Sequence, residues 1–323
     1  MPIIFHVNNM AVDLPYFLCY APYDCEVFMS RYFVTTDKTC DLPPEISIAD
    51  FAVIDMSYVM DGELYDGVEK PFLEPEEFYE RLKGGSDVKT SLVPLDNYNH
   101  FFENILEKGY DILHICFSSA LSGSFKNCLA SAEQMKKRFP ERKIFVVDSL
   151  SAGPGEGIMV MRAAKNRDLG MPIEQNFNDM EIIKYHIMHI LTVDDMHHLY
   201  RGGRISKTQA ILGTAVQLKP LIILNERGAL ENFGKAIGKK AAVRTIAEKA
   251  FERMSGYEIE NDAIIISHCL ALEDALYLKE KVAARYADKE IYIVPTSPII
   301  GAHLGCGAVT IHFIGNSKKA RLS

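Results

Sequence analysis

The sequence predicts an α/β fold built around a parallel β-sheet. Two successive strand–loop–helix units carry this prediction: Ile112–Phe117 precedes a helical pattern from Phe125 to Arg138, and Ile144–Val147 precedes one that runs to about Arg167. Short apolar strands that alternate with helices of roughly 10–15 residues are typical of parallel sheets with crossover helices. The length of 323 residues exceeds one ordinary hydrophobic core, so we expect two domains.

Before these units, the sequence contains further strand and helix candidates. The expected elements are a strand at 31–36, a strand at 51–59, a hairpin between Gly62 and Gly67, a helix at 74–82, a polar loop at 89–94 and a helix at 95–108. Acidic residues in the first turn of the helix that begins at Glu74 favour this start, because they oppose the helix dipole.

The second half alternates strands and helices again. The expected elements are a linker at 169–172, a helix at 173–185, a strand at 187–193, a helical turn at 194–200, a helix at 210–218, strands at 219–224 and 230–233 joined by a turn at 226–228, a helix at 245–254, a strand at 263–268, a helix at 273–285, a strand at 291–294, a glycine-rich loop at 298–307 and a strand at 308–314.

Composition and charge exclude several classes of function. A formal net charge of −8 argues against duplex nucleic acid or an anionic membrane surface as the main partner. No apolar run approaches the ~20 residues of a membrane span, so we expect no integral membrane segment. The seven cysteines form no CxxC pair, which indicates reduced, buried thiols in the cytoplasm. Residues 1–28 contain no Lys or Arg and are expected to form an extension outside the fold.

Hydroxyl side chains gather in three loops at the expected ends of strands: Thr90-Ser91, Ser118–Ser124 and Asp148–Ser151. The first N–H groups of a helix lack partners, and the helix dipole favours negative charge there. Hydroxyls at a strand–helix junction therefore suit a carboxylate or a phosphate. The alternative is ordinary turn and capping chemistry, in which Ser and Thr are also common.

Other catalytic and metal-binding patterns are weak. His303 is a candidate base for a serine nucleophile, but the G-x-S-x-G elbow is missing around Ser118–Ser122. His186, His189 and the pair His197-His198 lack zinc-ligand spacing and favour surface or capping roles. Arg201–Arg204 is basic and glycine-rich without the P-loop pattern, and it also suits a helix C-cap. We therefore expect neither a metal nor a cofactor.

Several short motifs follow one another over about residues 31–315: Thr36–Thr39, Lys89–Ser91, Ser118–Ser124, Val147–Ser149, Val193–Asp195, Arg201–Ser206, Lys219-Pro220 and Gly301–Gly307. Taken in this order, they resemble the motifs of the DegV family, whose members bind fatty acids and include the FakB subunit of bacterial fatty acid kinase.

The resemblance implies a two-domain α/β protein: an N-terminal domain (29–170) with a parallel sheet flanked by helices, a C-terminal α/β domain (171–323) with a mixed sheet, and a lipid between them. It implies that Thr90 and Ser122 hold the fatty acid carboxylate. His303 and Arg204 match the family's loop histidine and Gly-Gly-Arg arginine, and Ser91, Ser118 and Ser119 belong to the same two hydroxyl motifs.

The chain departs from the family pattern in two places. Thr90–Pro94 reads T-S-L-V-P where the family has T-S-Q-P, and Lys235–Ile237 lacks the arginine of the usual K-x-R. The resulting hypothesis is a cytoplasmic carrier of a long-chain fatty acid that has no catalysis of its own and presents the acid to a fatty acid kinase subunit. The alternative is an enzyme that acts on a carboxylated or phosphorylated metabolite with His303 as acid or base.

Overall fold

A parallel four-stranded sheet forms the core of the N-terminal part of the chain. The computed structural model describes residues 31–206 and 217–319. The strand order is β2-β1-β6-β7, and every neighbouring pair is parallel. These strands are β1 (Tyr32–Asp37), β2 (Phe51–Ile54), β6 (Asp111–Cys116) and β7 (Ile144–Asp148). This sheet and the mixed sheet described below confirm the predicted fold class.

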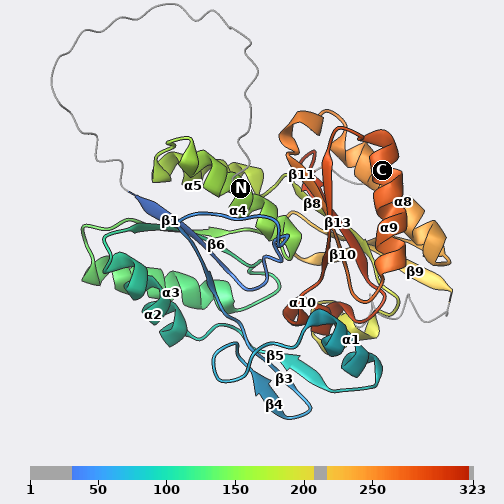
Figure 1. Cartoon of the computed structure of the whole chain (residues 1–323), viewed down its shortest axis with the longest axis horizontal. Coiled ribbons are helices and arrows are strands. Elements are labelled where there is room, and N and C mark those ends of the chain that lie inside the picture. The colour runs from blue at the N-terminus through green and yellow to red at the C-terminus, as the bar shows by residue number, and fades with distance from the viewer. Residues whose placement is uncertain (1–30, 207–216, 320–323) are drawn as a thin grey trace, which may run out of the picture.

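Helices cover both faces of this sheet, which is why all six residues of β6 are buried. Side chains alternate along the strand, so Ile112 and Cys116 pack against α2 (Leu95–Leu106) and α3 (Ser124–Arg138). Leu113 and Ile115 point to the opposite face and pack against α4 (Pro154–Asp168) and α5 (Ile173–Ile183). Figure 1 shows the two helix layers on either side of β1 and β6.

A six-stranded mixed sheet forms the core of the C-terminal part. Its order is β10-β9-β8-β13-β11-β12, and β11 and β12 are its parallel pair. The other pairs are antiparallel. These strands are β8 (Ile187–Thr192), β9 (Leu218–Leu224), β10 (Leu230–Ile237), β11 (Ala263–His268), β12 (Glu290–Pro295) and β13 (Val309–Ile314).

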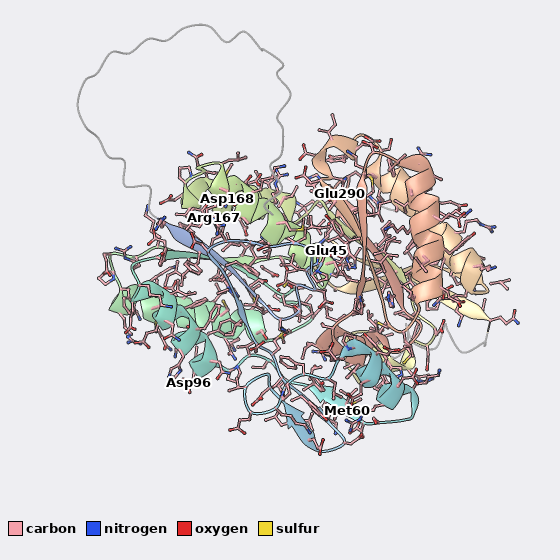
Figure 2. All side chains as sticks on the ribbon, viewed as in Figure 1. Glu45, Met60, Asp96, Arg167, Asp168 and Glu290 are labelled. Carbon is pink, nitrogen blue, oxygen red and sulfur yellow. The ribbon has the colours of Figure 1, made fainter. Side chains whose placement is uncertain are left out.

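One helix lies between the two sheets. On the outer face of the mixed sheet, α8 (Lys239–Met254) and α9 (Leu272–Arg285) bury strand residues such as Ile190 and Ile311. On the inner face, α4 joins Ile187 and Ile265 to the core of the parallel sheet. Arg167 lies at the C-terminal end of α4 (Figure 2). It donates hydrogen bonds to the carbonyls of Ala49 and Asp50, so α4 also holds the chain that leads into β2.

A small antiparallel sheet extends from the N-terminal part to the C-terminal part. Its strand order is β4-β3-β5. Its strands are β3 (Tyr58–Met60), β4 (Glu63–Tyr65) and β5 (Val88–Thr90), and its neighbours are the helices α1 (Pro75–Lys83), α6 (His197–Arg201) and α10 (Pro298–Leu304). The 3₁₀ helix Glu258–Glu260 lies elsewhere, where Glu260 pairs with Arg162 of α4. The Tyr79 hydroxyl of α1 donates to the Thr296 carbonyl at 2.9 Å, so α1 is fastened beside α10.

Several predicted elements differ from the observed ones. The strand predicted at 51–59 is two strands in two different sheets, with Asp55–Ser57 between them. The loop predicted at 89–94 begins within β5, and the helix predicted at 245–254 already begins at Lys239. The glycine-rich loop predicted at 298–307 contains α10, because Pro298 suits the first turn and Ile299 and Ala302 are buried.

Three expectations remain untested. The extension predicted at residues 1–28 lies outside the described residues. The helix predicted at 210–218 lies outside the described residues, apart from residues 217 and 218, and Leu218 begins β9. The division at residue 170 stays a prediction. Within residues 31–206 and 217–319, no helix combines the length and the apolar character needed to cross a membrane.

Candidate functional site

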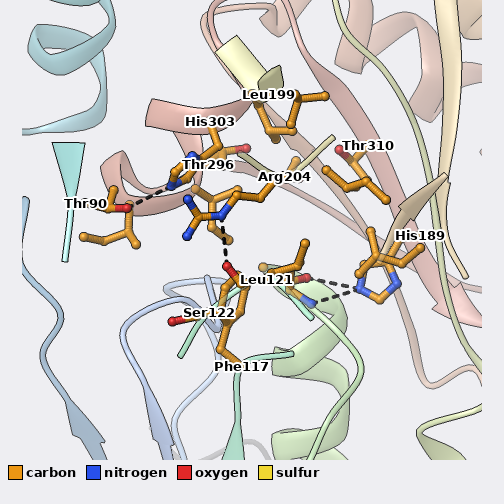
Figure 3. Close-up of a pocket in the computed structure, with 18 of the residues that line it drawn as sticks. Thr90, Phe117, Leu121, Ser122, His189, Leu199, Arg204, Thr296, His303 and Thr310 are labelled. Atoms are coloured by element: carbon orange, nitrogen blue, oxygen red, sulfur yellow. Dashed lines mark hydrogen bonds between the residues drawn. The ribbon is translucent and has the colours of Figure 1, made fainter. Parts of the chain in front are cut away.

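A cavity of about 240 Å³ lies between the parallel sheet and the mixed sheet. Its walls come from β5, the loops after β6 and β7, strands β8 to β11, strand β13, and helices α6 and α10. Most of the lining is apolar and consists of Met56, Leu92, Phe117, Leu121, Ala152, Leu191, Leu199, Leu224, Leu230, Ile299, Ile300 and Leu304. Thr90, Ser122, Arg204 and His303 lie on one side of it, and His189 and Thr310 lie on the other (Figure 3).

Thr90 and His303 form a hydrogen-bonded pair at the first side. The Thr90 Oγ1 at the end of β5 lies 2.8 Å from the His303 Nε2 on α10. Burial, together with the nearby positive charge of Arg204 and His198, lowers the pKa of His303 to about 4. The imidazole is therefore neutral near pH 7, and the fixed positive charge at this side comes from Arg204.

Arg204 and the preceding glycines explain the Arg-Gly-Gly-Arg motif. The Arg204 Nε donates to the Leu121 carbonyl at 2.9 Å, and its Nη1 donates to the Gly202 carbonyl. A Cβ on Gly202 would lie 2.2 Å from the His303 Nδ1. Glycine at this position therefore permits the close approach of His303, while Gly203 ends α6 with a φ of +72°.

Ser122 lies at the N-terminus of α3. Its Oγ is 2.9 Å from the Ser124 Oγ and accepts the Ser124 N–H at 3.2 Å. Ser122 is half-buried, and both it and Gly123 line the cavity. The 15-residue helix that follows directs its positive dipole end toward this point, which favours an anion.

The other predicted serines have different positions. Ser91 lines the cavity next to Thr90. Ser118 is fully buried outside the cavity lining, and its hydroxyl donates to the Gly228 carbonyl at 2.9 Å. Ser119 is exposed, and its N–H donates to the Asp148 carboxylate. The first two serines of the motif thus shape the loop, whereas Ser122 faces the cavity.

The motifs Thr36–Thr39 and Val193–Asp195 hold neighbouring segments in place but do not line the cavity. Asp37 accepts the Phe117 N–H at 2.9 Å and so fixes the start of the serine loop. Asp194 forms ion pairs with Lys219 at 2.8 Å and Lys239 at 3.0 Å. These pairs tie β9 and the start of α8 to the loop that follows β8.

Polar residues on the opposite side of the cavity were missed by the sequence analysis. His189 was expected at the surface or in a cap, but it is buried, and its Nε2 contacts the backbone of Ala152. His312 is its partner across β8 and β13, and it lies 3.0 Å from the Ser267 hydroxyl. Burial lowers the pKa of His189 well below its usual value and that of His312 to about 3, so both rings are neutral.

A signal for these residues was present in the sequence. Both histidines interrupt strands that are apolar apart from one threonine each, and a strand of this kind is buried on both faces. A polar residue there needs a polar partner or a cavity. Sequence alone did not show that His189 and His312 are paired across neighbouring strands.

Comparison with known proteins identifies the family. The model described as "Uncharacterised protein, DegV family" matches residues 32–316. The chain belongs to the DegV family. A DegV domain-containing protein of Clostridium perfringens is 32% identical over 297 residues, which is 90% of this chain and 100% of that protein.

Solved DegV structures share the fold. The fatty acid binding DegV family protein of Streptococcus agalactiae is 26% identical, with a TM-score of 0.78 over 89% of this chain and 100% of that one. The fatty acid kinase B3 protein of Streptococcus pneumoniae, loaded with linoleic acid, is 19% identical, with a TM-score of 0.78 over 88% of this chain and 100% of that one. The predicted family resemblance is thus confirmed.

Proposed function

We propose that this protein binds a long-chain fatty acid in the cavity between its two sheets, with the carboxylate held by Thr90, Ser122, Arg204 and His303. The observation that carries the proposal is the position of Arg204: a cation and neighbouring hydroxyls lie at one side of a mostly apolar cavity. The fatty-acid-binding DegV protein of Streptococcus agalactiae supports the choice of ligand.

The orientation of the ligand follows from the charges. An ionised carboxylate gains about 1.5–3 kcal/mol from each hydrogen bond to a protein donor, and more stabilisation comes from a cation nearby. Arg204 and the α3 dipole supply positive potential at the Thr90 side, whereas His189 and His312 on the other side are neutral. The carboxylate therefore belongs beside Arg204, and the tail runs along the leucines toward His189.

The tail supplies the main driving force. Burial of about fifteen methylenes at ~0.8 kcal/mol each gives a gross gain on the order of 12 kcal/mol. Lost translational and conformational freedom cancels much of this gain. The cavity of about 240 Å³ lies just below the usual range of roughly 300–1,000 Å³ for ligand sites, so we expect lining leucines to change rotamer when a long chain enters.

A second hollow supports presentation of the carboxylate to a separate kinase subunit. It encloses about 400 Å³ and adjoins the cavity at Thr90, Arg204 and His303. Lys89 and Arg201 line it from the solvent side and are exposed. Cations around the carboxylate end suit the phosphate groups of a phosphoryl donor brought by a partner. The resemblance to fatty acid kinase subunits agrees with this role.

Catalysis by the chain itself is not part of the proposal. A general base needs a pKa near the working pH and usually a third group that orients it. The pKa of His303 is lowered to about 4 by burial, and its Nδ1 has no hydrogen-bond partner among the described residues. These features support a binding role for His303 over the enzyme alternative.

The test is fatty acid affinity of a double variant, Thr90→Ala with Ser122→Ala. We expect at least a tenfold loss, because two donors to the carboxylate disappear. Ser119→Ala is the matched control, since Ser119 lies in the same loop outside the cavity and is exposed. Unchanged affinity in the folded double variant contradicts the site, and extraction of the purified protein that yields no long-chain acid contradicts the ligand class.

A further inference from the structure

His114, Cys116 and Cys128 form a compact group behind the parallel sheet. His114 and Cys116 are two residues apart on β6 and therefore share the face that packs against α2 and α3. Cys128 lies in the second turn of α3 above them. All three side chains are fully buried, and their donor atoms lie within 4.8 Å of one another. The three residues form no recognisable sequence motif, because they come together only when α3 packs against β6.

The His114 ring is oriented as a metal ligand is. Its Nδ1 lies 2.9 Å from the Thr35 hydroxyl, which is also fully buried. If the Nδ1–H donates to Thr35, the Nε2 carries the free lone pair that a metal needs. A hydrogen bond from the other ring nitrogen is the usual way in which proteins fix a ligating histidine. The His114 Nε2 is buried and has no hydrogen-bond partner among the described residues. A buried nitrogen without a hydrogen bond of ordinary geometry is rare in a core, and the side chain that interacts with this ring is Cys128.

We propose that His114, Cys116 and Cys128 bind one thiophilic metal ion, with Zn²⁺ as the ion that the charges favour. Zn–S and Zn–N bonds of about 2.3 and 2.0–2.1 Å place neighbouring donors about 3.5–4 Å apart. The group requires a contraction of at most about 1.3 Å to reach these separations. Two thiolates neutralise Zn²⁺, so the buried site carries no net charge, and binding releases the two thiol protons to solvent.

Tyr98 completes the surroundings of the group. Its hydroxyl lies 3.8 Å from the Cys116 Sγ, which places a neutral oxygen beside the two sulfurs. Its ring packs edge-on against His114 with centroids 5.6 Å apart, and Phe102 does the same at 5.4 Å. A dry, aromatic shell of this kind excludes water and holds the donors in place.

The proposed metal site is separate from the lipid cavity, but it adjoins the loop that carries Ser122 into the cavity wall. None of the three residues lines the cavity, whereas Phe117, the residue after Cys116, does. The ion would link the end of β6 to α3, the two elements that flank the Ser118–Gly123 loop. Metal binding is therefore expected to stabilise the loop that carries Ser122.

The test uses the full chain, reduced with a non-thiol reductant and freed of metal. Titration with Zn²⁺ against a chromophoric chelator should show one tight site per chain, and Co²⁺ should give a thiolate charge-transfer absorption. Cys128→Ala should weaken Zn²⁺ binding at least a hundredfold, and Thr35→Val roughly ten- to a hundredfold, because outer partners of ligands matter to this extent. Cys269→Ser is the matched control, since Cys269 is an equally buried thiol outside the group.

Three outcomes overturn the proposed metal site, and a fourth overturns the choice of ion. The first is that the wild-type chain binds Zn²⁺ no more tightly than the Cys128→Ala variant, and the second is that its Co²⁺ form lacks the thiolate absorption. The third is a disulfide between Cys116 and Cys128 in protein prepared without oxygen, which makes the pair a redox element instead. If Cys128→Ala fails to fold, the wild-type Co²⁺ spectrum and the Thr35→Val titration decide the question. Binding of Cu⁺ with exclusion of Zn²⁺ also refutes the choice of ion.

Discussion

Substitution of Gly202 by alanine tests whether close packing behind His303 holds the carboxylate site in shape. The Gly202 backbone has a φ of −70° and a ψ of −9°, which alanine adopts without strain. The added Cβ, however, would lie 2.2 Å from the His303 Nδ1, well inside the 3.0 Å that real Cβ contacts respect. The ring must therefore retreat by about 1 Å, and its hydrogen bond to Thr90, 2.8 Å long, is lost or weakened.

The size of the effect follows from two costs. Overpacking of a well-packed site typically destabilises a protein by about 1–3 kcal/mol. Displacement of His303 removes the contact that orients the Thr90 hydroxyl toward the carboxylate. Loss of that hydroxyl's hydrogen bond to a charged group, about 1.5–3 kcal/mol, corresponds to a loss of affinity of roughly ten- to a hundredfold. Isothermal titration with a long-chain fatty acid and chemical denaturation of Gly202→Ala measure the two quantities separately.

Gly203→Ala is the matched control for this experiment. A Cβ at Gly203 meets nothing within 4 Å, but the φ of +72° is strained for alanine. It should therefore lose about 1 kcal/mol of stability and keep its affinity for the ligand. If Gly202→Ala binds fatty acid as tightly as the wild type, or if both variants lose affinity equally, the assigned role of the His303 contact is wrong.

Three further expectations follow from the geometry. The pKa of His303 is about 4 in the folded protein and near 6.5 in the unfolded chain, so its contribution to the free energy of unfolding is complete above pH 6.5 and is lost as the pH falls toward 4. Between pH 7 and pH 5, the free energy of unfolding measured by denaturation should therefore fall by about 2 kcal/mol less in His303→Gln than in the wild type. An unaltered pH dependence would refute the assigned pKa. Ala152→Phe fills the tail region and should abolish binding of long chains, whereas the exposed Ala130→Phe should not; equal binding by both variants would place the tail elsewhere. Arg201→Glu, in the outer hollow only, should slow phosphorylation of the bound acid by a fatty acid kinase without a change in fatty acid affinity, and a matched loss of both would argue against a separate partner surface.

Local patterns carried much of the prediction. The strand–serine loop–helix unit was recognisable because an apolar run, a Ser/Gly turn and a helical pattern are all properties of neighbouring residues. The structure has this unit as β6, the loop and α3, with Ser122 facing the cavity. The glycine-rich segment after Ser297 was misjudged as a loop, because the burial of Ile299 and Ala302 outweighs the glycines and that burial depends on α1.

The sequence by itself determined the alternation of strands and helices, the serine loop and the ordered motifs of the family. Only the tertiary structure decided that Thr90 and His303, 213 residues apart, share a hydrogen bond. It also decided that His189 faces His312, and that His114 and Cys116 meet Cys128. The physical reason is that periodicity and turn chemistry act over a few residues, whereas contacts between sheets arise when distant apolar faces are buried together.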